Sequence, residues 1–253
     1  RRTAKQIAED ASPPREIGPA RVVELLGPER FHSDQITRLE APGAALGLAW
    51  TPFGGEVLTV EATAMPGSKG LQLTGQLGEV MRESAQAALS YVRANAAQLD
   101  IDPNFFENAD LHVHIPAGAT SKDGPSAGIT LCTALVSLLT ARKVRPGIAM
   151  TGEITLLGRV LPIGGLKEKV LAAHRAKIKT VIIPTDNQKD LEEVPIEARA
   201  HLIFAPVDRI DQVLALALEP PRPSEAEREE APPSEETGPS SLESEPLVAK
   251  PRA

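Results

Sequence analysis

The hydrophobic and polar positions of this chain follow two periods, one typical of strands and one typical of helices. Residues 57–64 alternate between apolar and polar side chains up to Pro66, which predicts a strand or hairpin arm. Residues 77–99 predict one long helix, with apolar positions that include Val80, Ala87, Leu89 and Val92. Further strands are predicted at 111–115, 147–151, 180–183 and 201–204, and further helices at 126–141, 166–177 and 208–217. This order predicts an α/β (α+β) domain with a mixed sheet and helices packed against it.

The two ends of the chain differ from its middle. Residues 20–26 form a short helical pattern, and a loop is expected from His32 to about Ala44. Residues 221–253 hold eight glutamates against four basic residues and are rich in proline and serine. Such a segment buries too little apolar surface to fold, so it is predicted to be a disordered acidic tail. We therefore expect a connecting segment at 1–43, a folded domain at 44–219 and the tail at 220–253.

Composition narrows the class of protein. The chain has 253 residues and a single cysteine, which excludes a disulfide framework. It has no apolar stretch long enough to cross a bilayer, so we expect no membrane partner and a cytoplasmic location. The formal net charge of −7, without a basic patch rich in aromatic residues, argues against nucleic acid as a partner. Because the chain starts at Arg1 rather than methionine, we expect a fragment of a longer protein.

One serine lies where a glycine-rich loop becomes a helix. Ser126 is surrounded by the small and turn-forming residues of 124–128, and an apolar run continues to Leu139. Backbone N–H groups at a helix start have no partner within the helix and favour negative charge. A serine there could be a nucleophile in acyl transfer beside its own oxyanion site. The alternative is an ordinary serine that caps the helix.

A second segment offers a candidate base. Residues 164–176 are typical of a helix with a glycine-rich start. On a helical wheel Lys169 falls on a face without bulky side chains, formed by Ala172, Ala173 and Ala176. Such a face lets another element approach closely, and burial there would favour the neutral amine. Lys167 falls on the other side of the helix, and periodicity leaves open which of the two lysines is buried and which is solvated.

Together the two segments resemble the proteolytic domain of the Lon protease family, in the type that is fused to an AAA+ ATPase. The family's serine motif, PKDGPSAG, appears at 121–128, with Ser121 where the family usually has proline. Its lysine segment appears nearly intact at 151–169, from Thr-Gly-Glu-Ile-Thr to Leu-Lys-Glu-Lys. The resemblance runs from about Leu26 to about Leu218. It implies a Lon-type fold, related to the second domain of ribosomal protein S5, and it makes 1–43 the end of the ATPase module's helical subdomain and a junction.

The resemblance also implies roles for single residues. The family's nucleophile falls on Ser126 and its general base on Lys169, so the implied site is a serine–lysine dyad that needs no histidine and no metal. Thr151 is implied to hydrogen bond the lysine, and Asp123 to control access to the serine. Trp50 matches a family tryptophan beside the substrate cleft, although a core aromatic residue is an equal interpretation.

Other chemistry is possible for some of these residues. His112 and His114 lie on one face of a predicted strand, where a catalytic triad or a metal site could include them. We expect them instead to line the polar face of a strand near the site. Cys132 lies in an apolar run and is best interpreted as a small buried hydrophobe. The glycine-rich segment does not match a phosphate-binding loop, because proline follows Gly124 where that loop requires lysine.

The sequence thus predicts a serine endopeptidase domain of an ATP-dependent Lon protease, acting on unfolded, damaged and short-lived regulatory proteins. The family implies a homo-oligomer, with the subunits arranged in a hexameric ring that encloses the sites. No cofactor is expected in this fragment, whereas ATP and Mg²⁺ are expected for the missing ATPase module. The alternative from another class is a Lon-like scaffold domain without proteolysis. The presence of both Ser126 and Lys169 argues against that alternative.

Overall fold

The computed structural model describes residues 4–5, 8, 17–27, 41–51, 54–116 and 121–221. The described residues up to Pro220 belong to one unit. The predicted acidic tail lies outside the described residues, apart from its first two positions, and so does most of the predicted loop from His32 to Ala44. The helical pattern at 20–26 is confirmed as α2 (Pro19–Leu26), which begins with a proline and ends at Gly27, whose φ is +89°.

The centre of the fold is a seven-stranded mixed sheet with the order β3-β4-β2-β1-β5-β8-β9. Its strands are β1 (Ala44–Thr51), β2 (Gly54–Pro66), β3 (Leu71–Thr74), β4 (Ala109–His114), β5 (Ile148–Met150), β8 (Thr180–Pro184) and β9 (Ile203–Val207). The pairs β2–β4 and β1–β2 are antiparallel, and the other four neighbouring pairs are parallel. A separate hairpin joins β6 (Glu153–Ile154) to β7 (Val160–Leu161). The predicted mixed α/β sheet is therefore confirmed.

The pattern missed β1 because that strand is buried on both faces. Ala45 belongs to one hydrophobic core, whereas Leu46 and Leu48 belong to a second core on the other side of the sheet. A strand with two buried faces has a nearly continuous apolar sequence instead of an alternating one. β3, β6 and β7 were also missed, since a strand of two to four residues is too short to show a period.

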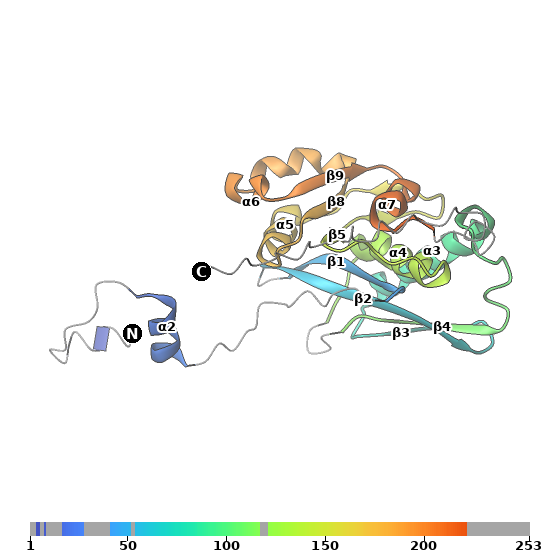
Figure 1. Ribbon diagram of the computed structural model, residues 1–253, viewed down its shortest axis with the longest axis horizontal. Helices are drawn as coiled ribbons and strands as arrows, with labels where there is room; N and C mark the ends of the chain where they lie inside the picture. Colours follow the sequence, from blue (N-terminus) through green and yellow to red (C-terminus); the bar gives the residue numbers. More distant parts are fainter. Residues whose placement is uncertain are drawn as a thin grey trace, which may run out of the picture. The chain divides into compact units, whose positions relative to one another are not determined.

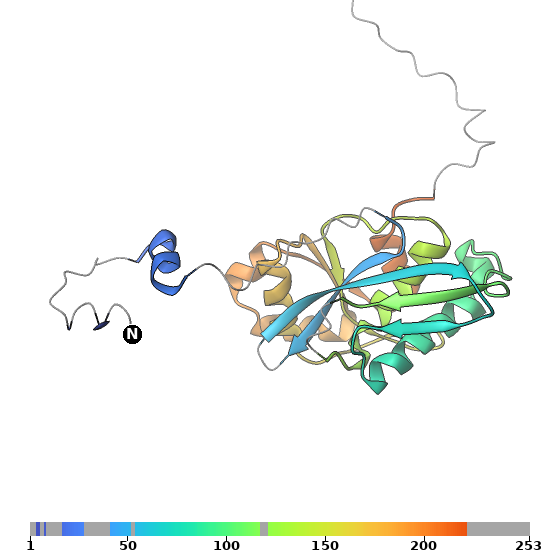
Figure 2. The ribbon, with the colours of Figure 1, turned by 90° about the horizontal axis from the view of Figure 1, so that it is seen from below.

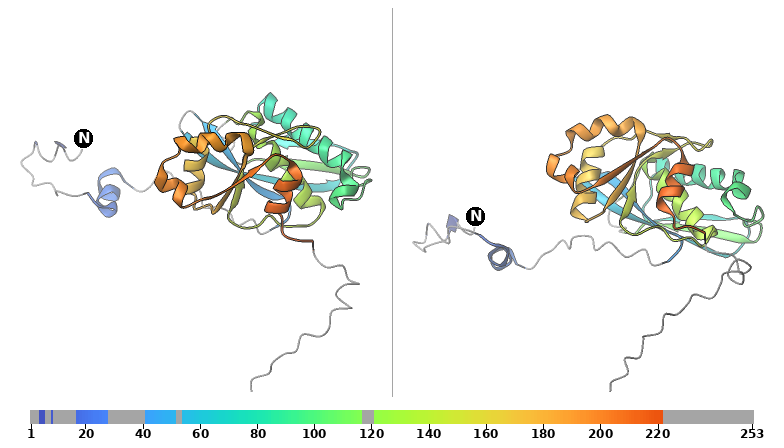
Figure 3. Two further views of the ribbon diagram at one scale, coloured as in Figure 1. Left: turned by 90° about the horizontal axis from the view of Figure 1, so that it is seen from above. Right: turned by 45° about the horizontal axis from the view of Figure 1, so that its top comes forward.

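Helices cover both faces of the sheet. The first core packs beneath α3 (Glu79–Ala94), α4 (Gly128–Leu139) and α7 (Ile210–Ala217), and the second beneath α5 (Leu166–Arg175) and α6 (Ile196–Ala200). Short 3₁₀ segments complete the fold: η1 (Ala96–Leu99), η2 (Pro125–Ala127) and η3 (Thr185–Glu193). Helices α5 and α6 lie with β8 and β9, away from α3 (Figure 1, Figure 3). No described helix combines the length and the apolar character that a membrane span needs.

The long helix predicted at 77–99 is in fact two shorter pieces. α3 ends at Ala94, where the side chain and the backbone N–H of Asn95 both donate to the carbonyl of Tyr91, and η1 follows. The prediction that Val80 lies on the apolar face is wrong, because 42% of this residue is exposed. The buried positions Met81, Ala85, Ala88 and Val92 set the face, and Val80 is rotated about 100° away from it.

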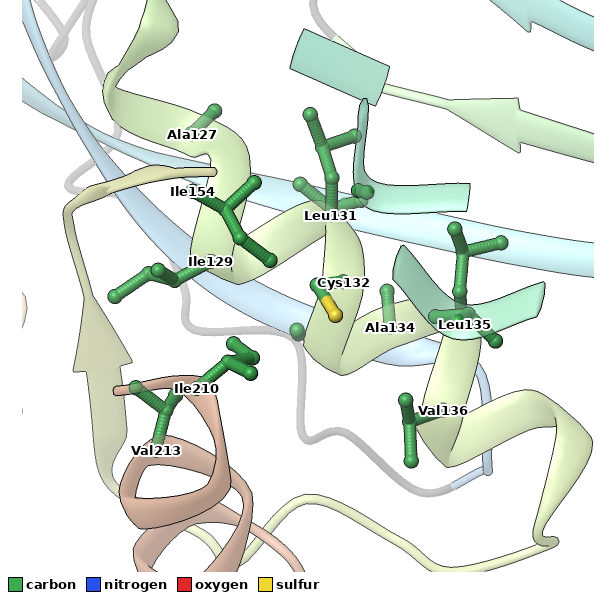
Figure 4. Close-up of a cluster of buried hydrophobic side chains, with 14 of the residues drawn as sticks. Ala127, Ile129, Leu131, Cys132, Ala134, Leu135, Val136, Ile154, Ile210 and Val213 are labelled. Carbon is green, nitrogen blue, oxygen red and sulfur yellow. The ribbon is translucent and has the colours of Figure 1, made fainter. Parts of the chain in front are cut away.

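The helix predicted at 126–141 begins with the 3₁₀ turn η2 and continues as α4. Nearly every residue of α4 is buried, as expected of a helix that is apolar all round. Figure 4 shows its side chains, with Ile210 and Val213 of α7 on one side. Cys132 is fully buried in this cluster, and burial raises the pKa of its thiol, so its interpretation as a buried hydrophobe is confirmed.

Candidate active site

Ser126 occupies the middle of the η2 turn, and its backbone is fixed to the segment that follows β5. The carbonyl of Ser126 accepts hydrogen bonds from the backbone N–H of Gly152 at 2.9 Å and from Thr151 Oγ1 at 3.3 Å. The carbonyl of Gly152 in turn accepts from the N–H of Ile129 in α4 at 3.1 Å. The capping interpretation is wrong, because α4 is preceded by Ala127 and has no side-chain cap. The hydroxyl of Ser126 is therefore free of a capping role.

The structure shows which of the two lysines is buried, a question that periodicity left open. Lys169 is 2% exposed, whereas Lys167 is exposed. Both belong to α5, but only Lys169 faces the sheet, together with Ala172 and Ala173. Burial lowers the pKa of Lys169 to about 8, because desolvation disfavours the ammonium form.

A glycine in β2 allows α5 to approach closely enough to bury Lys169. A Cβ atom added to Gly55 would lie 1.9 Å from the carbonyl oxygen of Glu168 and 2.9 Å from the backbone nitrogen of Lys169. Arg175 at the end of α5 also donates from its guanidinium to the carbonyl of Gly55 at 2.6 Å. The close approach that the alanine face predicts is therefore present, and glycine on the opposite strand makes it possible.

Ser126 and Lys169 line the same cleft, which has a volume of about 560 Å³. Ser126 comes from the side of the sheet that carries α4, and Lys169 comes from α5 on the other side. The carboxyl half of β1, from Leu48 to Trp50, lines the cleft, and β1 runs parallel to β5 with Gly47 opposite Met150. The cleft thus lies at the carboxyl end of a strand in the parallel part of the sheet, the usual position of sites in α/β sheets.

Trp50 lies at the rim of this cleft. It is 58% exposed, so its interpretation as a core aromatic residue is wrong. Its side chain packs on Gly165, the αL residue before α5, where an added Cβ would lie 3.0 Å from Trp50 Cβ. The indole therefore contacts the start of the helix that carries Lys169.

Asp123 also lines the cleft, with its side chain turned toward α3. Its Oδ1 accepts from the backbone N–H of Met81 at 3.0 Å and from that of Gly124 at 2.8 Å. A Cβ on Gly78 would lie 2.3 Å from its carboxyl carbon, so the loop before α3 is shaped to receive this side chain. Asp123 thereby joins the start of α3 to the serine loop.

Thr151 is fully buried and acts on the serine turn rather than on the cleft. Its hydroxyl donates to the carbonyl of Ser126, as described above, and the residue does not line the cleft. In the part of the chain that the structure describes, no hydrogen bond joins Ser126 Oγ to Lys169 Nζ. The two side chains share the cleft without a hydrogen bond between them.

Comparison with known proteins decides the family. Residues 16–220 match the Lon protease (S16) C-terminal proteolytic domain. The chain belongs to this family. It is 59% identical to the Lon protease of Anaeromyxobacter dehalogenans (strain 2CP-C) over 209 residues. This aligned region makes up 83% of this chain and 25% of the relative. It is 57% identical to Lon protease 2 of Myxococcus xanthus over 221 residues, an aligned region that makes up 87% of this chain and 27% of the relative.

The Lon resemblance that the two motifs predict is therefore confirmed, and with it the serine endopeptidase class. A third relative is the Lon protease of Desulfosudis oleivorans (strain DSM 6200 / JCM 39069 / Hxd3), 56% identical over 218 residues that make up 86% of this chain and 27% of the relative. The chain spans about a quarter of the length of these relatives. It corresponds to their proteolytic part.

The two histidines lie away from the Lon cleft. Thr74 Oγ1 hydrogen bonds His112 Nε2 at 2.8 Å and His114 Nδ1 at 2.7 Å, and neither histidine lines the cleft. A triad with Ser126 is therefore incompatible with the structure. Within the described residues, no three His, Cys, Asp or Glu side chains gather as metal ligands would.

Sequence reasoning missed Lys122, although it lies in the Lon serine motif. Lys122 is only 5% exposed, and its Nζ donates to the carbonyl of Gly75 at 3.1 Å. Its backbone N–H donates to Gln76, and its carbonyl accepts from Gly78. Burial lowers the pKa of its amine. These contacts hold the serine loop against the β3–α3 connection, and no period in the sequence signals them.

Removing the Lys122 amine is expected to destabilise this loop. The variant Lys122→Ala leaves the carbonyl of Gly75 without that donor, so we expect the free energy of unfolding to fall by about 1–3 kcal/mol. Urea denaturation measures the change. The exposed Lys167→Ala is the matched control and should stay within about 0.5 kcal/mol of the parent chain. Equal stability of the two variants would contradict the anchoring role.

Proposed function

We propose that this Lon domain cleaves peptide bonds with Ser126 as nucleophile and Lys169 as general base. The burial of Lys169 in the cleft that Ser126 lines carries the proposal. A lysine in water is neutral in about one molecule in a thousand at pH 7.5, whereas a pKa of about 8 makes about a quarter of the amines neutral. Burial therefore supplies a base that works near neutral pH.

The mechanism follows from these two groups. As the Ser126 hydroxyl attacks the scissile carbonyl, Oγ forms a bond to carbon and its proton passes to Lys169 Nζ. The C–N bond then breaks, and Lys169 returns the proton to the leaving amine. Water enters, gives a proton to Lys169 and cleaves the ester of the acyl-enzyme, which restores the Ser126 hydroxyl. Backbone N–H groups near Ser126, at the start of α4, would stabilise the oxyanion.

Three further residues in and beside the cleft support this dyad. Thr151 holds the serine turn through the carbonyl of Ser126, and its hydroxyl oxygen can also accept a hydrogen bond from Lys169. Asp123 controls access, because its carboxylate links the serine loop to α3. Trp50 contributes an exposed aromatic surface at the rim, suited to apolar side chains of a substrate.

For the whole protein we propose ATP-dependent degradation of unfolded, damaged and short-lived regulatory proteins in the cytoplasm. The support is family membership and the name Lon protease of the relatives. In this proposal the domain forms a homohexameric ring that admits only unfolded chains. ATP and Mg²⁺ act in an ATPase module outside this chain, and hydrolysis at Ser126 needs no cofactor.

Covalent labelling tests the nucleophile directly. A fluorophosphonate reagent should modify Ser126, as mass spectrometry of the digested protein would show. Prior incubation with a peptide boronate, which bonds reversibly to a nucleophilic hydroxyl, should block the reaction. The scaffold alternative, favoured by no observation in the cleft, predicts no labelling and no cleavage of casein or fluorogenic peptides. Either absence would contradict the proposal.

The pH dependence of cleavage tests the base. Because Lys169 acts as the free amine with a pKa of about 8, kcat/KM for a fluorogenic peptide should rise with pH and level off above about 8. Between pH 6 and pH 8 the free base grows from about 1% to about 50%, so the rate should rise about fifty-fold. A plateau already reached at pH 7 would indicate a base with a histidine-like pKa and would exclude Lys169.

A further inference from the structure

A second hollow lies between α3 and β3, apart from the catalytic cleft. We call it the α3–β3 groove; its volume is about 450 Å³. Its lining residues are Lys69, Leu71, Leu73, Arg82, Gln86, Leu89, Ser90, Arg93 and Phe106. Three of these carry positive charge and none is acidic, but Lys69 pairs with Glu107 at 2.6 Å, so the two arginines are the charges that matter here. Figure 2 shows β3 near α3, and β3 is the last strand of the sheet, so one of its edges is unpaired within the described sheet.

The two arginines of the groove keep donors available for a ligand. Among the described residues neither Arg82 nor Arg93 forms an ion pair. Arg82 donates only from Nε, to the carbonyl of Leu77 at 3.0 Å. Arg93 stacks over the ring of Phe106 at 4.6 Å, a contact that uses the face of the guanidinium and leaves the donors at its edge.

The spacing of these arginines defines the length of the ligand. Arg82 and Arg93 are eleven positions apart on one helix, close to three turns, so they lie on the same face. At 1.5 Å per residue their Cα atoms are about 16 Å apart. Because Arg82 is hydrogen bonded to the carbonyl of Leu77 and Arg93 lies over Phe106, a single small anion is a poor match for both. An extended polypeptide, which advances about 3.3 Å per residue, covers this distance in about five residues. Because only alternate side chains share one face of an extended chain, two side chains that both face α3 across this distance are about six positions apart.

The floor of the groove is apolar between the two charges. Leu89 is 7% exposed, and Leu71 and Leu73 are partly buried against the same core. Aliphatic side chains of a ligand would bury their surface there. The ligand's backbone can pair with the unpaired edge of β3, as in peptide recognition by strand addition. The Arg82 end of the groove is the end nearer the catalytic cleft along α3, because Met81, the residue before Arg82, lines that cleft.

We propose that the α3–β3 groove binds an extended polypeptide segment in which two carboxylates, about six residues apart, flank aliphatic side chains on the same face of the segment. Arg82 and Arg93 bind the carboxylates, and Leu71, Leu73 and Leu89 contact the apolar middle. This use of the groove rests on the proposed function, since the segment would belong to a polypeptide substrate. The groove then holds one part of the substrate while another part occupies the cleft, and it favours acidic–apolar chains.

Fluorescence anisotropy with a labelled peptide tests the groove. The probe is fluorescein-Ser-Glu-Thr-Leu-Ser-Leu-Thr-Glu-Ser, whose two glutamates and two leucines share one face when the peptide is extended. The protein is the 253-residue chain with Ser126→Ala, which binds without cleaving. We expect Arg93→Glu to weaken binding at least about tenfold, because a favourable charge pair becomes a repulsive one. Replacing both probe glutamates by glutamine should weaken binding similarly, and added salt should reduce the difference between the two probes.

Arg159→Glu is the matched control, since Arg159 is exposed on the β6–β7 hairpin and lies outside the groove. It should change the affinity less than about twofold. Leu73→Gln offers a second variant, which should weaken both probes by removing apolar contact. If folded Arg93→Glu binds the acidic probe as well as the parent does, or if the glutamine probe binds equally well, the proposal is wrong. Failure of Ser126 labelling would instead contradict the proposed function and leave this binding result unaffected.

Discussion

Replacing Lys169 by methionine is expected to abolish peptide cleavage without destabilising the domain. Among the described residues, this amine is the only buried base that lines the cleft, so its loss should lower kcat by about a thousandfold or more. Methionine has a similar length and fills the space beside Ala172 and Ala173 without a polar group to desolvate. Stability should therefore be equal to that of the parent or higher.

Casein and fluorogenic-peptide cleavage measure the loss of activity in Lys169→Met, and urea denaturation measures its stability. Lys167→Met is the matched control, because Lys167 lies in the same turn but is exposed, and it should keep full activity. Ser126→Ala should lose activity to the same extent as Lys169→Met. The double variant should be no worse than either single variant, since the two groups act as one unit. Cleavage that survives in Lys169→Met would disprove the dyad.

The stability of the parent chain should also change with pH in a way that Lys169→Met does not. The folded-state pKa of about 8 lies below the unfolded value of about 10.5. Between these values the unfolded chain binds one more proton, so the free energy of unfolding rises with pH across this window. The rise attributable to Lys169 is roughly 3 kcal/mol. If the free energy of unfolding of the parent and of Lys169→Met changed equally with pH, the buried amine would not be desolvated.

Replacing Gly55 by valine is the second change with a large expected effect. An added Cβ would fall 1.9 Å from the carbonyl oxygen of Glu168, so β2 and α5 must separate at this point. We expect the free energy of unfolding to fall by about 3 kcal/mol or more, the upper range for overpacking. Separation also admits water to Lys169, which should raise its pKa and shift the pH–rate profile upward.

Gly164→Ala is the stability control for this variant. No atom lies within 4 Å of a Cβ added there, and its φ is not positive, so the change should cost less than about 0.5 kcal/mol. Thermal or urea unfolding compares the two variants, and the peptide assay over pH 6–10 follows the shift. A Gly55→Val chain with the parent's stability and pH profile would show that the contact between β2 and α5 does not control the amine.

Sequence patterns identified the parts of this protein whose signal is local. The serine loop at 121–128 and the lysine segment at 151–169 are continuous stretches, so their residues alone sufficed to indicate the family. The strands at 57–64 and 111–115 alternate because each has one face that is less buried than the other. β1 was not predicted because it is packed on both faces. The predicted helix was longer than α3 because Asn95 ends α3 through contacts with Tyr91.

The amino-acid sequence by itself determined the α/β character of the fold, the positions of its serine and lysine motifs and its place among Lon proteolytic domains. Tertiary structure alone decided that Lys169 rather than Lys167 is buried, because that choice depends on Gly55, more than a hundred residues away in the chain. It also decided that Trp50 lies at the cleft rim and that Lys122 anchors the serine loop. Burial and desolvation depend on which distant segments come into contact, and the local periodicity of side chains does not predict those contacts.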